Sequence, residues 1–199
     1  MTENEMKVIK TVAEIGVIGA NQLTRIFFRG NKKKTRKMIQ KGFLIQHTLE
    51  QGTKSIPFFT LSSVLNKQFE GVQLEYLTVK AILRRMLFFQ LYGRLIEQFP
   101  FTVERSEVEP FVGVLKRNGL VFHVGVVRGD IEKWETFFKW HYDNERIILV
   151  TEKLTFLTPI QPYIKDKLIR VTTDENLKTA PTDDLFYEWD GTRWIKEER

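Results

Sequence analysis

The stretch Asn31-Lys32-Lys33-Lys34-Thr35-Arg36-Lys37-Met38-Ile39-Gln40-Lys41-Gly42 decides the fold of the N-terminal third of this chain. Six of its residues are cationic. Thr35, Met38, Ile39 and the following Phe43 fall at helical spacing, so that an apolar seam can dock the segment while the charges face outward. Asn31 is a favourable N-cap and Gly42 is favourable just past a helix end. The stretch therefore predicts a short, capped helix with a dense positive face.

The sequence around this helix predicts two further helices before it and a hairpin after it. Apolar residues recur at helical spacing over 4–15 and again over 21–28. The segments 43–47 and 56–61 have the composition of strands and flank a turn at 50–52. Three helices followed by a two-stranded hairpin describe a winged helix-turn-helix. In that fold the third helix enters the DNA major groove and the hairpin contacts the adjacent backbone.

The positive charge of the chain is confined to this first third. The formal net charge is +6. Residues 1–70 hold 12 Lys and Arg against 5 Asp and Glu, whereas residues 71–199 hold 19 against 20. This asymmetry favours a polyanion-binding module joined to a nearly neutral one. A basic face that is merely solvated is the alternative.

The expected DNA-binding residues are the cations of the third helix and its neighbours: Arg29, Lys32, Lys33, Lys34, Arg36, Lys37, Lys41 and Lys54. Lys32, Lys33 and Arg36 occupy the end of the helix that points into the groove. Lys37, Lys41 and Lys54 are placed to hold phosphates. Bidentate recognition of guanine is limited to Arg36 and Arg29. We therefore expect more backbone affinity than sequence discrimination from one monomer, and a homodimer that reads two half-sites would restore specificity.

The rest of the chain predicts a connecting helix and a second, α/β domain. A helical pattern over 73–98 is apolar around more than one face, which suits a bridge between domains, a dimer interface or ordinary core. After this helix, the spacing of apolar residues changes to that typical of strands. One further helix interrupts the strands, and the last two form a hairpin at Asp190-Gly191. We expect an α+β protein with a winged helix over 1–70, a connecting helix over 71–100 and an α/β domain over 101–199. The strands are predicted at 101–103, 111–115, 120–127, 147–151 and 168–172, with a hairpin turn at Asn118-Gly119. The helix is predicted at 131–140 with Asp130 near its N-cap, and its aromatic residues are interpreted as a core face. Trp189 and Trp194 are expected to face each other across the final hairpin.

Composition excludes several classes of protein. The chain has no cysteine, which rules out disulfides and thiolate metal sites. No apolar run reaches the roughly 20 residues of a membrane span, and the acidic start differs from a secretory signal. His47, His123 and His141 show no metal-ligand spacing, and no phosphate-binding glycine loop is present. We expect a soluble cytoplasmic protein with no cofactor, no metal and no membrane partner.

Several short motifs together resemble the replication-relaxation family of bacterial plasmids and conjugative elements. They are Gln22–Phe28, Met38–Leu44, Pro57–Leu61, Pro110–Leu115 and Phe122–Gly129. The resemblance implies a winged helix followed by a domain similar to a restriction endonuclease. It also implies work on plasmid or mobile-element DNA, in replication, its control or transfer.

The second half of the chain departs from the family at the positions that would carry catalysis. The resemblance implies an aspartate directly after the proline of Pro110–Leu115. It also implies an acidic residue near the end of Phe122–Gly129. Phe111 occupies the first position, and Gly125 or a neighbouring valine the second. Without that pair a nuclease cannot hold Mg²⁺. We therefore expect a DNA-binding protein that acts by site occupancy and is not an enzyme.

Three alternatives remain open at the level of sequence. The first is a transcriptional repressor of such an element, which would bind DNA through the same residues but at a different DNA site. The second is a metal-dependent nuclease that uses displaced carboxylates from Glu104, Glu107 or Glu109. The third is an interaction module whose winged helix binds protein. The C-terminal domain is expected to supply dimerisation or a protein partner.

Overall fold

The computed structural model describes residues 1–197 and contains two compact units, Met1–Ile96 and Glu97–Arg199. Both units combine helices with a β-sheet, so the expectation of a mixed α and β protein is confirmed. Within the described residues, no helix is long and apolar enough to cross a membrane.

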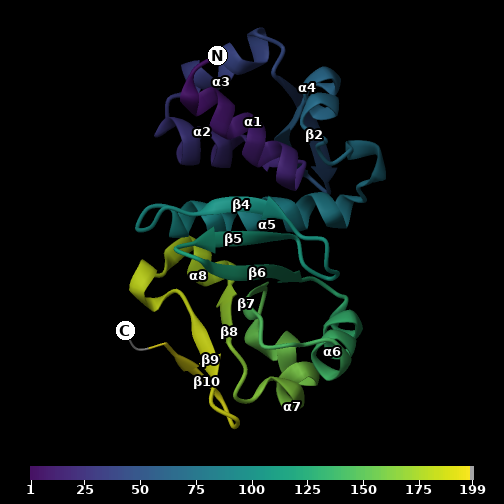
Figure 1. Cartoon of the computed structure of the whole chain (residues 1–199), viewed down its shortest axis with the longest axis vertical. Coiled ribbons are helices and arrows are strands. Elements are labelled where there is room, and N and C mark those ends of the chain that lie inside the picture. The colour runs from purple at the N-terminus through teal and green to yellow at the C-terminus, as the bar shows by residue number, and fades with distance from the viewer. Residues whose placement is uncertain (198–199) are drawn as a thin grey trace. The chain divides into compact units, whose positions relative to one another are not determined.

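The first unit combines helices with a three-stranded sheet (Figure 1). The strand order is β1-β3-β2, and both pairings are antiparallel. The elements are α1 (Glu3–Ile15), β1 (Ile18–Gly19), α2 (Ala20–Phe28), α3 (Lys32–Gln40), β2 (Leu44–Gln51), β3 (Lys54–Leu61), α4 (Ser63–Gln68), the 3₁₀ turn η1 (Leu74–Tyr76) and α5 (Val79–Leu95). The three predicted helices and the predicted hairpin are all present, whereas β1 and α4 were not predicted.

Helix α1 begins at a capping box. The Glu5 amide donates to Thr2 Oγ1 at 3.2 Å, and the Thr2 amide donates to Glu5 Oε2 at 2.8 Å. These two bonds satisfy amide groups that a helix start would leave unpaired. The helix ends at Gly16, whose φ of 93° disfavours residues with a side chain. Its buried face is Val8, Ile9, Val12, Ala13 and Ile15.

The predicted long helix over 73–98 is interrupted. A 3₁₀ turn covers its first residues, and α5 begins only after Thr78, whose hydroxyl accepts from the Ala81 amide at 3.2 Å. This N-cap explains the break, because the capping residue itself has an extended backbone. Helix α5 belongs to the first unit and packs against α2, where the rings of Phe27 and Tyr92 lie 6.4 Å apart.

The second unit is built on a seven-stranded sheet with the order β10-β9-β8-β7-β6-β5-β4 (Figure 1). The three strands β6, β7 and β8 are parallel, and the other pairings are antiparallel. The elements are β4 (Thr102–Arg105), β5 (Gly113–Arg117), β6 (Leu120–Val127), α6 (Ile131–Trp140), β7 (Arg146–Thr151), η2 (Leu154–Ile160), α7 (Gln161–Ile164), β8 (Ile169–Thr173), α8 (Asp174–Thr179), η3 (Thr182–Asp184), β9 (Tyr187–Trp189) and β10 (Trp194–Lys196).

Turn chemistry sets both predicted hairpins of this sheet. Asn118 and Gly119 have φ values of 49° and 76°, as the mirror-image turn between β5 and β6 requires. In the last hairpin Trp194 lies directly opposite Trp189, as expected. The segments η2, α7 and α8 were not predicted.

The core of the second unit is organised around Trp134, which is fully buried. Gly125 of β6 leaves room for it: a Cβ at position 125 would lie 1.9 Å from Trp134 Cη2. Phe137 and Phe138 are buried beside this indole, which confirms the core interpretation of this aromatic cluster for those three residues. Trp140 is an exception. It is 70% exposed because its position on α6 points away from the buried stripe.

The contact between Gly125 and Trp134 predicts the effect of adding one methyl group at position 125. The variant Gly125→Ala should lower the free energy of unfolding by about 2–3 kcal/mol, because neither the strand nor the buried indole can yield without strain. Urea unfolding followed by tryptophan fluorescence measures the change. In a Trp134→Phe background the same substitution should cost clearly less, and an equal cost in both backgrounds would contradict the proposed contact.

Candidate nucleic-acid interface

The connection between α2 and α3 is short, and hydrogen bonds fix its conformation. Arg29 ends α2 with a left-handed φ of 48°, and Gly30 follows with φ 82°. The Gly30 amide donates to the Thr24 carbonyl at 3.0 Å, and Asn31 Oδ1 accepts from the Lys33 amide at 3.0 Å. These bonds close one helix and open the next within three residues. The predicted N-cap at Asn31 is confirmed.

A buried hydrogen bond between two hydroxyl groups fixes how α3 lies on α2. Thr24 Oγ1 and Thr35 Oγ1 are 3.1 Å apart, and both residues are buried. Thr24 Oγ1 also donates to the Ala20 carbonyl at 3.0 Å. A hydroxyl has one proton, so Thr35 must be the donor in the interhelical bond. Met38, which is fully buried, completes the seam under α3.

The opposite face of α3 is exposed and basic. Lys32, Lys33, Lys34, Arg36 and Lys37 are all exposed. Within residues 1–197, none of these side chains forms an ion pair with a carboxylate. Helical spacing places four residues farthest from the buried seam: Lys33, Arg36, Lys37 and Gln40. Five uncompensated cations therefore lie on a helix of nine residues, which creates a strong local positive potential.

Lys41 differs from the other cations because its charge is already engaged. Lys41 Nζ lies 2.6 Å from Glu5 Oε1, and the Glu5 side chain is only 8% exposed. The hydrogen bond from Lys41 lowers the pKa of Glu5, and the bond from the Thr2 amide lowers it further. The pair joins the end of α3 to the first turn of α1. Lys41 thus positions the helix, and the phosphate contact expected from its sequence stays a prediction.

The hairpin of β2 and β3 presents a further cation beside its tip. Gly52 makes the turn with φ 59°, and Lys54 is exposed. His47 stiffens the hairpin: its Nε2 lies 2.9 Å from Thr60 Oγ1, and its ring stacks on Phe58 with centroids 5.1 Å apart. Burial lowers the pKa of His47, which favours its neutral form. These contacts give His47 a structural role in the hairpin.

Two glutamines were missed as site residues. Gln22 Oε1 accepts from the Gly19 amide at 3.0 Å, and its Nε2 donates to the Met86 carbonyl of α5 at 2.6 Å. Gln22 therefore anchors α2 to the unit, and its spacing from Gly19 is that of a capping box. Gln40 lies on the outer face of α3, where its amide can pair with adenine. Its helical spacing from Lys33 was the available signal.

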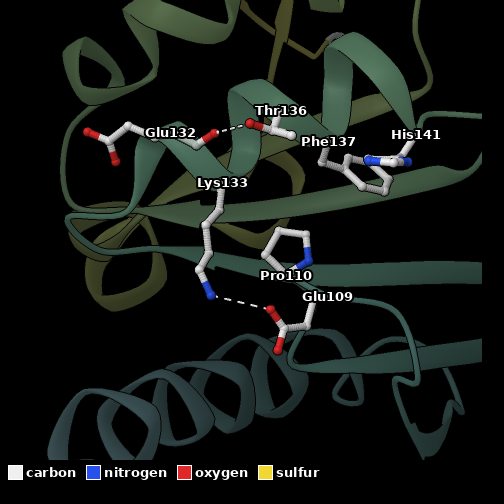
Figure 2. Close-up of a pocket in the computed structure, with 7 residues that line it drawn as sticks. All are labelled: Glu109, Pro110, Glu132, Lys133, Thr136, Phe137 and His141. Atoms are coloured by element: carbon white, nitrogen blue, oxygen red, sulfur yellow. Dashed lines mark hydrogen bonds and ion pairs between the residues drawn. The ribbon is translucent and has the colours of Figure 1, made fainter.

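The carboxylates considered for a displaced nuclease site are dispersed in the second unit. Glu104 forms an ion pair with Lys116 on β5, and Glu107 is exposed. Figure 2 shows Glu109 beside Lys133 of α6, with Glu109 Oε2 3.3 Å from Lys133 Nζ, on a pocket of about 400 Å³. Among the described residues, no group of three histidines or carboxylates is arranged to hold a metal ion.

The carboxylates that do gather lie after the parallel strands. Arg128 follows β6 and forms ion pairs with Glu152, which follows β7, and with Asp174, which follows β8. Asp130 stands at the N-cap position of α6, as expected, but its side chain forms no capping bond to the helix. Its Oδ1 accepts from the Arg128 amide at 3.1 Å instead. A guanidinium thus occupies the centre of this acidic group and neutralises part of its charge.

The two positions at which the family resemblance implies acids are filled by aromatic packing. The Phe111 ring is buried against Trp134, with centroids 5.3 Å apart, and Gly125 lies directly under the same indole. A carboxylate at either position would be desolvated without a partner.

Comparison with known proteins gives no assignment. No protein-family model matches the chain, and no curated protein matches it.

The buried hydroxyl pair predicts an asymmetric effect of two isosteric substitutions. Thr24→Val should cost about 2 kcal/mol because it leaves the Thr35 proton without an acceptor, whereas Thr35→Val should cost about 1 kcal/mol. The double variant should cost less than the sum of the two. Urea unfolding of the three variants measures these values, and equal costs for the two single variants would contradict the assigned donor.

The Lys41–Glu5 pair predicts a pH-dependent contribution to stability. Because the pKa of Glu5 is lower in the folded protein, the stabilisation is complete above the ordinary value of 4.5 and is lost as the pH falls through the lowered value. Glu5→Gln preserves the capping box, so it should lower stability at pH 7 by no more than about 1 kcal/mol. Urea unfolding should show this difference shrinking as the pH falls below 4.5, and a constant difference would contradict the ion pair.

Proposed function

We propose that this protein binds specific sites in double-stranded DNA and that its first unit is a winged helix-turn-helix. The observation that carries the proposal is the exposed face of α3, with Lys32, Lys33, Lys34, Arg36 and Lys37 unpaired above a buried seam. A helix of this diameter fits the major groove, and unpaired cations are attracted to phosphates. Lys54 on the hairpin is placed to contact the adjacent backbone.

The side chains of α3 differ in whether their chemistry suits contacts with bases or with phosphates. Arg36 can pair bidentately with guanine and Gln40 with adenine, so these two side chains supply base recognition. Lys33 and Lys37 flank them as point charges and favour phosphates. Two base-reading side chains specify few base pairs. A homodimer that reads two half-sites would supply the remaining discrimination.

We propose that the second unit is a restriction-endonuclease-like domain that works without hydrolysis. The antiparallel pair β5–β6 followed by α6 and the parallel strand β7 supports this assignment. The packing of Phe111 and Gly125 around Trp134 supports the absence of a metal-binding carboxylate pair. The family resemblance then suggests occupancy of a site on plasmid or mobile-element DNA, in replication, its control or transfer, with the second unit supplying a dimer contact or a protein partner.

The experiment that tests the proposal first selects the fragments of the encoding genome that the protein binds. It then compares the binding of two variants with matched charge reversals to a selected site. The wild type should enrich one or a few sites, and a footprint should show two related half-sites. Lys33→Glu/Arg36→Glu should weaken binding to such a site at least about 100-fold, because a base contact and its neighbouring charge are lost together.

The control variant Lys7→Glu/Lys10→Glu makes the same change in net charge on exposed residues of α1. It should retain binding to the selected site. Equal losses in both variants, or no enriched site with the wild type, would contradict recognition through α3. The position of the enriched sites separates a role at an origin or transfer region from repression at a promoter.

A further inference from the structure

A pocket of about 480 Å³ in the second unit has no role in the proposed recognition of duplex DNA. Its lining includes residues near the starts of three neighbouring strands: Phe122 of β6, Ile147 of β7 and Ile169 of β8. Residues of the segment 164–168 and of the hairpin of β9 and β10 complete the lining. This volume lies in the range of pockets that hold small organic ligands.

One wall of the pocket is aromatic. Trp189 and Trp194 lie opposite each other on the hairpin, with ring centroids 5.2 Å apart and planes tilted by 58°. Both rings pack against the core while remaining partly exposed. The indole N–H of Trp194 is buried and has no acceptor among the described residues. The wall therefore offers a stacking surface and carries a donor whose hydrogen bond is unmet.

The hairpin does not need these tryptophans to form its turn. Asp190 Oδ1 accepts from the Thr192 amide at 2.7 Å and from the Arg193 amide at 2.8 Å, which closes the turn. These bonds, with that of the Thr192 hydroxyl, lower the pKa of Asp190. Its carboxylate is thus directed to its own turn and is not available to a ligand.

The charges that remain available in the pocket are mainly positive. The lining contains three cations and three carboxylates: Arg146, Lys167, Arg170, Asp166, Glu188 and Asp190. Arg170 is engaged, since it forms an ion pair with Glu197 and lies 4.0 Å from Glu188. In residues 1–197, no carboxylate forms an ion pair with Arg146 or Lys167. Asp166 is then the remaining acid of the lining.

Lys167 is held at a defined place beside the pocket. Its Nζ lies 3.7 Å from the centre of the Tyr142 ring, and the Tyr142 hydroxyl accepts from the Leu168 amide at 3.2 Å. Burial lowers the pKa of Lys167, and the charge of Glu145 opposes this shift. An anion at this position would compensate the desolvated ammonium better than water does.

We propose that this pocket binds a nucleotide, with the base against Trp189 and Trp194 and the phosphate held by Arg146 and Lys167. Aromatic rings beside cations are the combination that proteins use for single-stranded nucleic acid. The guanidinium of Arg146 matches two phosphate oxygens, and Lys167 adds a point charge. The nucleotide can come from two sources: a free mononucleotide or one unit of single-stranded DNA.

Calorimetric titration of the full chain tests this proposal. The titrations use the Lys33→Glu/Arg36→Glu background, so that the outcome does not depend on duplex binding by the first unit. The ligands are dTMP, thymidine, inorganic phosphate and an oligothymidylate of eight units. One dTMP should bind per chain, at least about tenfold more tightly than thymidine or phosphate alone, because stacking and charge act together.

Two double variants of equal charge distinguish the pocket from the rest of the surface. Arg146→Ala/Lys167→Ala should weaken dTMP at least about tenfold, whereas Lys139→Ala/Lys153→Ala, outside the lining, should leave binding unchanged. Unchanged thermal unfolding verifies that the variants fold. No dTMP or oligonucleotide binding at millimolar concentration, or equal binding by both variants, would overturn the proposal. Much tighter binding of the oligonucleotide than of dTMP, lost in the first variant, identifies single-stranded DNA as the source.

Discussion

The packing of Thr35 and Met38 beneath α3 is the constraint on which the proposed DNA-binding surface depends. Five uncompensated cations on nine residues repel one another, and an isolated helix of this length and charge would not persist in water. The buried hydroxyl bond to Thr24 and the buried thioether of Met38 hold the helix in place. Lys41, paired with Glu5, secures its C-terminal end. The repelling charges therefore all face outward, where a polyanion can compensate them.

A second constraint shapes the C-terminal unit. Trp134 requires the space above Gly125, and its indole packs against Phe111. Phe111 and Gly125 are also the positions considered from the sequence for metal-binding acids. Aromatic contacts stabilise the fold at both positions. Charge is gathered instead around Arg128, where a guanidinium occupies the centre of the acidic group.

Much of the fold was predictable because local signals were strong. The caps at Thr2 and Asn31 and the turn at Asn118 act within three or four residues, and the apolar run of β6 is long. The break before α5 was missed because apolar residues continue across it, and only the Thr78 cap marks it. The pairing of Lys41 with Glu5 could not be predicted, since the partners lie 36 residues apart. The pocket beside Trp189 could not be predicted either. It depends on the order of the strands in the sheet, and the spacing of residues along the sequence does not reveal that order.

The most direct test is the salt dependence of binding to a duplex DNA fragment, measured for the wild type and for Lys33→Glu/Arg36→Glu. If the five outward cations of α3 and Lys54 neutralise phosphates, the logarithm of the association constant should fall linearly with the logarithm of salt concentration, with a slope of about −5. The variant should bind more weakly and show a shallower slope. A slope near zero, or the same slope in both proteins, would mean that α3 is a solvated face and not a DNA-binding surface.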